Sequence, residues 1–328
     1  MPGGHDAGSR YLVTGGAGFI GSNLVRFLLD TDPDVSVTNL DALSYAGVRA
    51  TVDELDRSER HRFVHGDVRD RSLLSQVVPG HDVIVHCAAE SHVDRSISGP
   101  TVFADVNVVG TAALLEAAMD AGVERFVQVS TDEVYGSIDL GSAAEDAPLR
   151  PSSPYSASKA GADLLALAYA RTFGYRPIIT RCTNNYGPYQ YPEKVIPLFI
   201  TNLLEGRKLP LYGDGEHERD WLFVKDHCEA IKLVIDRGSP GEVYNIAADE
   251  PLTNNELSRA LLAALDRDES WIEPVADRPG HDRRYALDSA KVRALGWSPR
   301  HSFMEGVAAT VEWYREREDW WRPLKVVA

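Results

Sequence analysis

The chain has 328 residues, of which 44% are hydrophobic and 25% are charged, and its formal net charge at pH 7 is -15. A chain of this length and composition can bury a large core, and we expect two lobes rather than two separable domains. The acidic balance argues against a nucleic-acid polymer as partner, because phosphate backbones need clustered Lys and Arg.

Cysteine usage and apolar runs restrict the class of protein further. Cys87, Cys182 and Cys228 are too few and too scattered for a disulfide framework, and no C-x-x-C or H-E-x-x-H pattern offers a metal site. Residues 1–10 lack the apolar core of a signal peptide, and no later apolar run approaches the roughly 20 residues of a membrane span. We therefore expect a cytoplasmic protein with no metal and no membrane partner.

The first predicted elements form a dinucleotide-binding turn. A short apolar strand, residues 11–14, is followed by G-G-A-G-F-I-G-S and a helical run, so Gly15, Gly18 and Gly21 are spaced G-x-x-G-x-x-G. The first glycine permits a tight turn, the second lets a pyrophosphate approach the backbone, and the third lets the helix pack against the strand. This arrangement predicts a dinucleotide cofactor.

A second strand, residues 35–40, ends at Asp41, about 20 residues after Gly21. A carboxylate at this position can accept both hydroxyls of an adenosine ribose and would repel a 2'-phosphate, so NAD is expected over NADP. The alternative is an aspartate that caps a helix after a glycine turn.

Further strands continue the pattern. Residues 62–65 lead to Asp67, which could bond the adenine edge, and residues 82–86 run into C-A-A-E-S-H-V-D, where small alanines leave room for a cofactor. Residues 105–122 predict a helix that is apolar on more than one face, as in a buried helix. With a strand at 178–181, about six parallel strands precede Asn184, so the fold class is α/β with a doubly wound parallel sheet.

The stretch from Val127 to Lys159 carries the predicted chemistry. An apolar strand delivers Thr131, Asp132 and Glu133 to its C-terminal end, where open parallel sheets bind ligands. A helix then begins near Tyr155. Tyr155 and Lys159 are four residues apart and share one helix face, so the ammonium favours the phenolate and lets Tyr155 act as a base. Taken alone, Y-x-x-x-K is more often an ordinary surface pair.

Beyond Asn185 the chain becomes rich in proline, glycine and loops. A helix at 225–237 and a strand at 243–246 are expected to return to the main lobe, and the remainder, with a Trp-rich C-terminal helix, would form a smaller lobe. We assign residues 1–184, with returning segments near 222–248, to a cofactor-binding domain, and 185–328 mainly to a substrate-binding lobe.

The motifs T-G-G-A-G-F-I-G-S, S-T-D-E-V-Y-G and Y-S-A-S-K together resemble those of the extended short-chain dehydrogenases/reductases, the NAD-dependent epimerase/dehydratase family. Nearly the whole chain, including E-R-D-W-L-F-V-K-D-H and D-R-P-G-H-D-R-R-Y, resembles its dTDP-glucose 4,6-dehydratases. The resemblance implies a Rossmann fold, NAD as cofactor, dTDP-glucose as substrate, a role in deoxysugar biosynthesis, and a homodimer formed through helices near 105–121 and 155–173.

The resemblance also implies residue roles. Tyr155, supported by Lys159, would take the proton of the 4-hydroxyl, and Thr131 would bond the developing carbonyl oxygen. Glu133 would remove the C5 proton as base, while protonated Asp132 would give its proton to the departing 6-hydroxyl. Neighbouring acids raise one pKa, which suits this division of labour.

Cofactor and substrate contacts are implied as well, with Asn185 on the nicotinamide side and two arginines on the diphosphate. The expected cofactor-binding residues are Gly15, Gly18, Phe19, Ile20, Gly21, Asp41, Ala42, Leu43, Ser44, Asp67, Val68, Ala88, Ala89, Ser91, Val106, Tyr155, Lys159 and Asn185. The expected substrate-binding residues are Ser91, Thr131, Asn184, Lys194, Val195, Pro210, Tyr212, Arg219, Asn254, Asp277, Arg278 and His281.

Other functions fit part of the pattern. A sugar-nucleotide 4-epimerase or a UDP-glucuronate decarboxylase would use the glycine turn and Tyr155 but lacks the adjacent Asp-Glu pair. Outside enzymes, a redox-sensing NAD-binding scaffold would need no intact catalytic set. The loop between Gly136 and Pro154 is shorter than in some dehydratases of this type, and residues 1–10 have no evident role.

Overall fold

The computed structural model describes residues 8–277 and 281–325. The chain divides into two compact units. The first contains Met1–Ser130, Ser153–Thr180 and Lys232–Tyr244, and the second contains Thr131–Ser152, Arg181–Ile231 and Asn245–Ala328. The assignment of the parts to cofactor and substrate binding stays a prediction.

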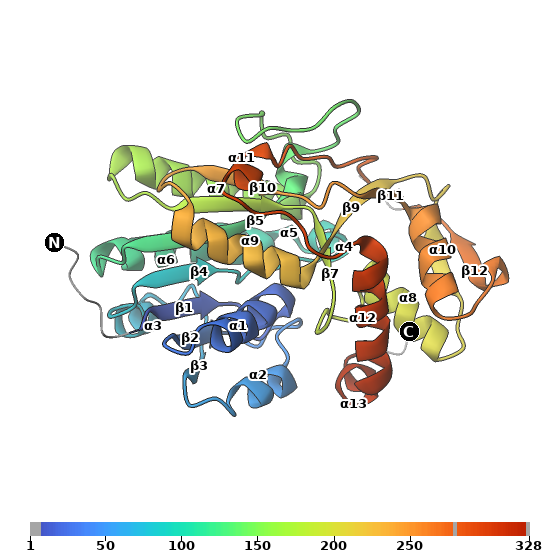
Figure 1. Ribbon diagram of the computed structural model, residues 1–328. Coiled ribbons are helices and arrows are strands. Elements are labelled where there is room, and N and C mark those ends of the chain that lie inside the picture. The colour runs from blue at the N-terminus through green and yellow to red at the C-terminus, as the bar shows by residue number, and fades with distance from the viewer. Residues whose placement is uncertain (1–7, 278–280, 326–328) are drawn as a thin grey trace. The chain divides into compact units, whose positions relative to one another are not determined.

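A seven-stranded sheet forms the centre of the fold, in the order β10-β6-β5-β4-β1-β2-β3 (Figure 1). Its strands are β1 (Arg10–Thr14), β2 (Ser36–Asp41), β3 (His61–His65), β4 (Val83–His86), β5 (Arg125–Thr131), β6 (Ile178–Cys182) and β10 (Val243–Ile246). β1 pairs in parallel with β2 and with β4, so the strand order reverses between β1 and β4. The predicted doubly wound parallel sheet is confirmed, and this reversal is where such sheets bind ligands.

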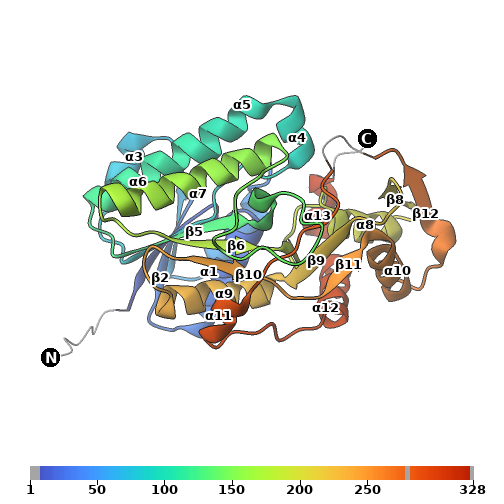
Figure 2. The ribbon, with the colours of Figure 1, turned by 90° about the horizontal axis from the view of Figure 1, so that it is seen from above.

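Helices of the first unit cover both faces of the sheet, with α3, α6 and α7 on one side and α1 on the other (Figure 2). They are α1 (Phe19–Thr31), α2 (Arg49–Leu55), α3 (Arg71–Val77), α4 (Val93–Ser98), α5 (Pro100–Phe103), α6 (Thr111–Asp120) and α7 (Pro154–Thr172). The start of α7 is fixed by a capping box of Ser153 and Ser156 with Pro154 in the first turn. Buried Leu12, Ile84 and Phe126 belong to the core beneath these helices.

The helix predicted at 105–122 differs from the structure. A π-helix, Ala104–Gly110, precedes α6, and it holds buried Asn107. The side chain of Asn107 accepts a hydrogen bond from the Glu90 amide (2.8 Å) and donates to the Glu90 carbonyl (3.0 Å) and to Ser158 Oγ (2.8 Å). π-Turns of this kind often occur at functional sites.

The same region corrects the expectation that no apolar run approaches the length of a membrane span. Helical residues Pro100–Asp120 have a mean hydropathy of 1.5 over an 18-residue window, which is long and apolar enough to span a bilayer. Leu114, Leu115 and Ala118 of this segment are buried in the hydrophobic core. The segment is apolar on several faces because it is a core helix, not because it needs lipid.

The second unit contains shorter sheets. β7 (Asn184–Tyr186), β9 (Glu218–Phe223) and β11 (Pro251–Thr253) form a three-stranded sheet, and β8 (Leu209–Tyr212) pairs with β12 (Ile272–Val275). The helices are α8 (Val195–Leu204), α10 (Asn254–Ala264), α11 (Ala290–Ala294), α12 (Phe303–Glu316) and α13 (Glu318–Trp321), and α9 (Val224–Arg237) runs from this unit into the first. Trp321 is fully buried and donates its indole N–H to the carbonyl of Tyr314 (2.7 Å).

A comparison of two glycines separates the effect of close packing at the first turn from the effect of backbone strain. Gly15 and Gly122 both have positive φ, +74° and +67°, but a Cβ on Gly15 would meet the Ala88 nitrogen at 2.6 Å whereas one on Gly122 meets nothing within 4 Å. We expect Gly122→Ala to lower the free energy of unfolding by about 1 to 2 kcal/mol through backbone strain alone. Gly15→Ala should cost clearly more, as measured by thermal denaturation. Equal losses would contradict the close approach of the turn to Ala88.

Candidate active site

The glycine turn between β1 and α1 is shaped to receive an anionic group. Gly15 donates its amide to the Leu40 carbonyl (2.9 Å), and a Cβ on Gly21 would lie 2.2 Å from the Gly15 carbonyl oxygen. A Cβ on Gly18 would meet only that oxygen, at 3.3 Å, so one side of the turn is open. Gly18 is the N-cap of α1 and supplies no side-chain cap, which leaves amide donors for a phosphate. The turn therefore fits the pyrophosphate of a dinucleotide.

Asp41 stands at the end of β2 and is mostly buried. Its Oδ2 accepts the Ala17 amide (2.9 Å) and its Oδ1 the Leu43 amide (2.7 Å). Burial raises the pKa of the carboxyl, and these two amides oppose the rise. The alternative of a helix cap does not hold, because the next helix, α2, begins at Arg49 after its N-cap Val48. A carboxylate has lone pairs beyond the two used here, so it can still accept ribose hydroxyls.

Tyr155 and Lys159 lie on α7 and are both buried, with 8% and 4% exposure, so they are not an ordinary surface pair. Lys159 Nζ donates to the carbonyl of Val129 in β5 (2.8 Å). Its charge also acts on His86, whose pKa falls to about 3, first because the ring is buried and second because of the Lys159 ammonium. The buried ammonium is therefore a strong local source of positive potential.

A directional hydrogen-bond chain fixes the tautomer of His86. Thr111 Oγ1 donates to the Asn107 carbonyl (2.6 Å), so it accepts from His86 Nε2 (3.0 Å). His86 Nδ1 then accepts from Thr14 Oγ1 (2.7 Å), which in turn accepts the Ala88 amide (3.3 Å). The chain ties β1, β4 and the π-helix together beneath the predicted cofactor residues.

The acidic pair follows β5 directly, in a 3₁₀ helix at Asp132–Tyr135. The Glu133 amide donates to Thr131 Oγ1 (3.3 Å), which donates to Asp132 Oδ1 (3.1 Å). Asp132 is 2% exposed, and its pKa rises to about 8, chiefly by burial and next by the neighbouring charge of Glu133, against a lowering effect of Arg219. Asp132 thus carries a proton at neutral pH.

The two carboxyl oxygens of Asp132 have different surroundings. Oδ1 shares a hydrogen bond with the Thr131 hydroxyl, whereas Oδ2 is buried and has no hydrogen-bond partner among the described residues. The Thr131 hydroxyl, which was expected to bond a substrate oxygen, is engaged with Asp132 here and would have to turn to reach a substrate.

Arg219 is held rigidly in the second unit and is 6% exposed. Its guanidinium donates to the carbonyls of Glu218 (2.7 Å), Asp282 (2.8 Å) and Arg283 (3.4 Å) and stacks on the ring of Tyr285 at 4.2 Å. Within the described part of the chain it has no carboxylate partner, so its charge is not neutralised by an ion pair. Such a fixed cation is suited to an anionic ligand.

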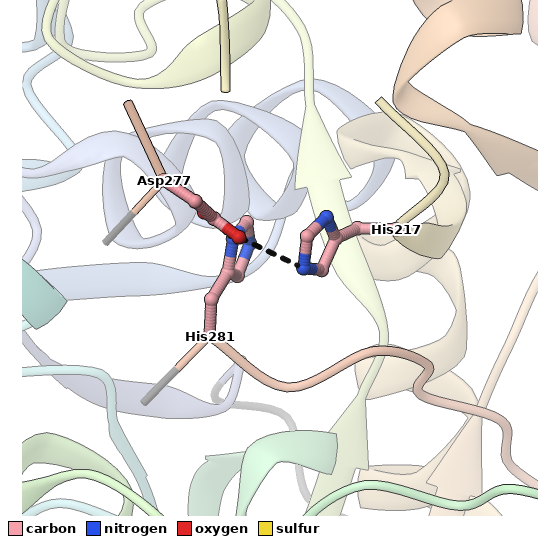
Figure 3. A group of neighbouring side chains, drawn as sticks. All are labelled: His217, Asp277 and His281. Atoms are coloured by element: carbon pink, nitrogen blue, oxygen red, sulfur yellow. Dashed lines mark hydrogen bonds and ion pairs between the residues drawn. The ribbon is translucent and has the colours of Figure 1, made fainter. Parts of the chain in front are cut away.

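Asp277 and His281 lie beside His217, which the sequence did not single out (Figure 3). Two imidazole nitrogens and a carboxylate oxygen lie within 4.8 Å of one another, a donor set that zinc can use. The two rings are nearly parallel, however, at 13° and 3.8 Å between centroids. An ion must lie in the plane of each ring that binds it, and stacked planes share no such point, so the cluster is arranged for hydrogen bonding.

The other expected residues occupy identifiable places, and their roles stay predictions. In the first unit, Asp67 pairs with Arg69 (2.6 Å), and Ser91 lies 3.5 Å from the Tyr45 hydroxyl. In the second unit, Asn185 is buried and donates to the Thr183 carbonyl (2.9 Å). The remaining second-unit positions are Asn184 in β7, Lys194 and Val195 at the start of α8, Pro210 and Tyr212 in β8, and Asn254 at the start of α10. Arg278 lies outside the described residues.

Four further residues belong to these surroundings: His86, Asn107, His217 and Tyr285. Their contacts join segments far apart in the sequence, so no local spacing marks them. The only signals were the H-C-A-A run for His86 and the repetition of histidine and aspartate in G-D-G-E-H and D-R-P-G-H-D.

The buried proton of Asp132 predicts a pH-dependent stability. A carboxyl whose pKa is higher in the folded chain weakens folding as pH rises from its unfolded value near 4 to about 8. We expect Asp132→Asn to remove this dependence. The unfolding temperature of the variant, relative to that of the unmodified protein, should therefore rise between pH 5 and pH 8. The exposed Asp146→Asn is the control. A difference that does not change with pH would refute a protonated Asp132.

Comparison with known proteins identifies the family of the chain. The GDP-mannose 4,6 dehydratase family model matches residues 12–310. A dTDP-glucose 4,6-dehydratase of Streptomyces antibioticus is 53% identical over 320 residues, covering 96% of this chain and 95% of the relative. The low-salt glycan biosynthesis protein Agl12 of Haloferax volcanii is also 53% identical, over 303 residues, covering 92% of this chain and 97% of the relative.

Solved structures show the same relationship. The dTDP-glucose 4,6-dehydratase DesIV of Streptomyces venezuelae, crystallised with NAD and dTDP, is 58% identical, with a TM-score of 0.93 and coverage of 96% of this chain and 100% of that one. A UDP-glucose 4-epimerase of Thermus thermophilus in complex with NAD is 34% identical, with a TM-score of 0.86 and coverage of 94% and 99%. The chain therefore belongs to the NAD-dependent epimerase/dehydratase family of extended short-chain dehydrogenases/reductases, alongside the dTDP-glucose 4,6-dehydratases.

Proposed function

We propose that the protein is an NAD-dependent hydro-lyase that converts dTDP-glucose to dTDP-4-keto-6-deoxyglucose and water, in deoxysugar biosynthesis. The observation that carries the proposal is the buried Asp132 beside Glu133 at the end of β5, since elimination of water needs an acid and a base together. Relatives that are half identical over nearly the whole chain and bear this name support it.

The residues around the glycine turn fit NAD. Gly15, Gly18 and Gly21 would hold the pyrophosphate and Asp41 the adenosine ribose. When bound, NAD accepts hydride from C4 of the sugar and returns it to C6, so it ends the cycle unchanged. We propose that NAD contacts all of the cofactor-binding residues that were expected from the sequence.

The first step depends on a base at the 4-hydroxyl. Tyr155 would take that proton as phenolate, and the Lys159 ammonium one helical turn away favours the phenolate. The Val129 carbonyl holds the ammonium in place at 2.8 Å. Thr131, once its hydroxyl turns from Asp132, would bond the developing carbonyl oxygen at C4.

The second step removes water across C5 and C6. The C4 ketone acidifies the hydrogen on C5, which Glu133 would take as general base. Asp132 would give its proton to the departing 6-hydroxyl, so the proton and the hydroxyl leave as one water molecule. A carboxyl with a pKa of about 8 is protonated at neutral pH yet still able to donate, which matches the demand on a general acid.

Substrate binding is proposed for the second unit. Arg219, with its fixed guanidinium, and Arg278 would contact the diphosphate. His281, Asn184, Lys194 and Asn254 match other positions of dehydratases that contact the nucleotide sugar. The preference for thymine as the base rests on likeness to the relatives.

The enzymatic alternative is a 4-epimerase or a decarboxylase, because such enzymes share the fold and the Tyr-Lys pair. The epimerase from Thermus thermophilus is less similar to this chain than the dehydratases, and epimerisation uses no acid-base pair for water loss. Incubation with dTDP-, UDP- and GDP-glucose distinguishes the cases: the 4-keto product absorbs in alkali, whereas an epimerase gives the galactose isomer. The non-enzymatic alternative, an NAD-sensing scaffold, predicts no turnover at all.

Three substitutions separate the steps. Tyr155→Phe should abolish turnover, because no other group takes the 4-hydroxyl proton. Glu133→Gln and Asp132→Asn should each lower kcat by about 10²- to 10⁴-fold while the fold is kept. Glu133→Gln should also stop the exchange of the C5 hydrogen with deuterated solvent, measured by mass spectrometry. Substantial turnover by Tyr155→Phe, or normal exchange in Glu133→Gln, would overturn these roles.

We propose further that the protein forms a homodimer. Several large apolar side chains on or directly after helical segments of the first unit are exposed by 42% to 58%. They are Ile97, Val102, Val109, Leu164 and Phe173. Exposed apolar patches on helices are typical of interfaces.

Light scattering tests the dimer. We expect Leu164→Glu to convert a dimer of this 36.1 kDa chain into a monomer at micromolar concentration, because a charge would be buried without a partner. Leu140→Glu is the matched control, since Leu140 is 92% exposed on a loop of the second unit. A monomer before substitution would rule out the dimer.

We propose that the enzyme acts in the cytoplasm, without a membrane or nucleic-acid partner. The net charge of -15 agrees with the absence of a polyanionic partner.

A further inference from the structure

We propose that His217, Asp277 and His281 form a proton-coupled diphosphate site, in which His217 gains a proton when the anion binds. The inference deepens the proposed function, because it assigns a residue and a pH dependence to the site that would hold the substrate's diphosphate. It rests on geometry within the second unit. His281 and Asp277 were expected to contact substrate, whereas His217 was not among the residues expected from the sequence.

The two imidazoles share one carboxylate. His281 Nδ1 lies 2.8 Å from Asp277 Oδ1, and His217 Nε2 lies 3.5 Å from Asp277 Oδ2 (Figure 3). The rings stack at 3.8 Å between centroids. The carboxylate of Asp277 can balance the charge of one imidazolium, and two stacked imidazolium ions would repel each other. Without a second anion, the cluster therefore favours at most one protonated imidazole.

The surroundings keep His217 neutral in the free protein. The side chain is 5% exposed, and burial is the main cause that lowers its pKa; Arg219 and Arg283 lower it further, while Asp277 and Asp214 raise it. Arg283 is paired with Asp214 (2.9 Å), whereas Arg219 donates only to carbonyls. The surroundings of His217 therefore combine the positive charge of Arg219 with a neutral imidazole.

The second nitrogen of His217 supplies the position for the added proton. Its Nδ1 is buried and has no hydrogen-bond partner among the described residues. A protonated ring needs an acceptor at both nitrogens. Asp277 serves Nε2, and a phosphate oxygen would serve Nδ1 after the ring or its neighbours move, because Nδ1 is closed to solvent here. A diphosphate thus raises the pKa of His217 and draws a proton from solvent as it binds.

The sign of the pH dependence follows. Because the complex holds more protons than the free protein, affinity for the diphosphate falls as pH rises through the pKa of His217 in the complex. A merely structural histidine would alter stability without changing the number of protons taken up.

Calorimetry on the NAD-loaded protein measures that number. Heats of dTDP binding at pH 7.5 in buffers of different ionisation enthalpy should show uptake of up to about one proton per site. His217→Phe keeps the stacked ring and His217→Gln keeps a donor to Asp277, yet neither titrates, so both should lose the uptake while still binding dTDP. Both variants should unfold within a few degrees of the unmodified protein.

The outcomes are separable. No uptake by the unmodified protein, or equal uptake by the two variants, overturns the role of His217. Failure of dTDP to bind the unmodified protein counts against the proposed function instead. In that event the His217 ring is titrated by nuclear magnetic resonance with and without inorganic pyrophosphate. A raised pKa with pyrophosphate supports the site, and an unchanged titration curve overturns it.

Discussion

Burial of one carboxyl beside another is the constraint on which the chemistry depends. In water, Asp132 and Glu133 would both be ionised at neutral pH, and an enzyme with two bases has no acid for the leaving hydroxyl. Withdrawal of Asp132 from solvent makes its charged form costly, and the neighbouring charge of Glu133 adds to that cost. The strand that ends at Thr131 places Asp132 in a buried position and Glu133 next to it in a 3₁₀ helix, and burial raises the pKa of the Asp132 carboxyl to about 8.

The first unit contains a buried positive charge, Lys159, where the second contains the buried acid Asp132. Lys159 is nearly as buried as Asp132, but the Val129 carbonyl stabilises its ammonium, and its field helps to keep His86 neutral. Neutral His86 can then accept from Thr14 and donate to Thr111, which an imidazolium could not do. The buried Lys159 ammonium thus helps to keep His86 neutral, and the hydrogen bonds to Thr111 and Thr14 fix which ring nitrogen carries the proton.

Local patterns made much of this predictable. Strands that are buried on both faces read as short apolar runs, which is why their positions, and the doubly wound order, followed from the sequence. A helix was expected to begin near Tyr155, and α7 begins at Pro154, where Ser153 and Ser156 form a local capping box. The π-helix was missed, since it depends on Asn107 bonding Glu90 and Ser158, 17 and 51 residues away. Pairing of His217 with His281 has the same non-local origin. The position of Asp132 at a strand end could be predicted from the sequence. Its burial could not, because burial depends on tertiary packing.

Fold likeness alone cannot decide between water loss and epimerisation. The 4-epimerase from Thermus thermophilus matches this chain with a TM-score of 0.86, so the sheet, the glycine turn and the cofactor are shared between the two chemistries. Both reactions begin by oxidising C4. They diverge only at the next step, where a ketone either rotates and is reduced again or loses a proton from C5. The second course requires a base for that proton and an acid for the hydroxyl at C6. We propose that the two residues after β5 meet that requirement, and the burial of Asp132 is what keeps one of them protonated.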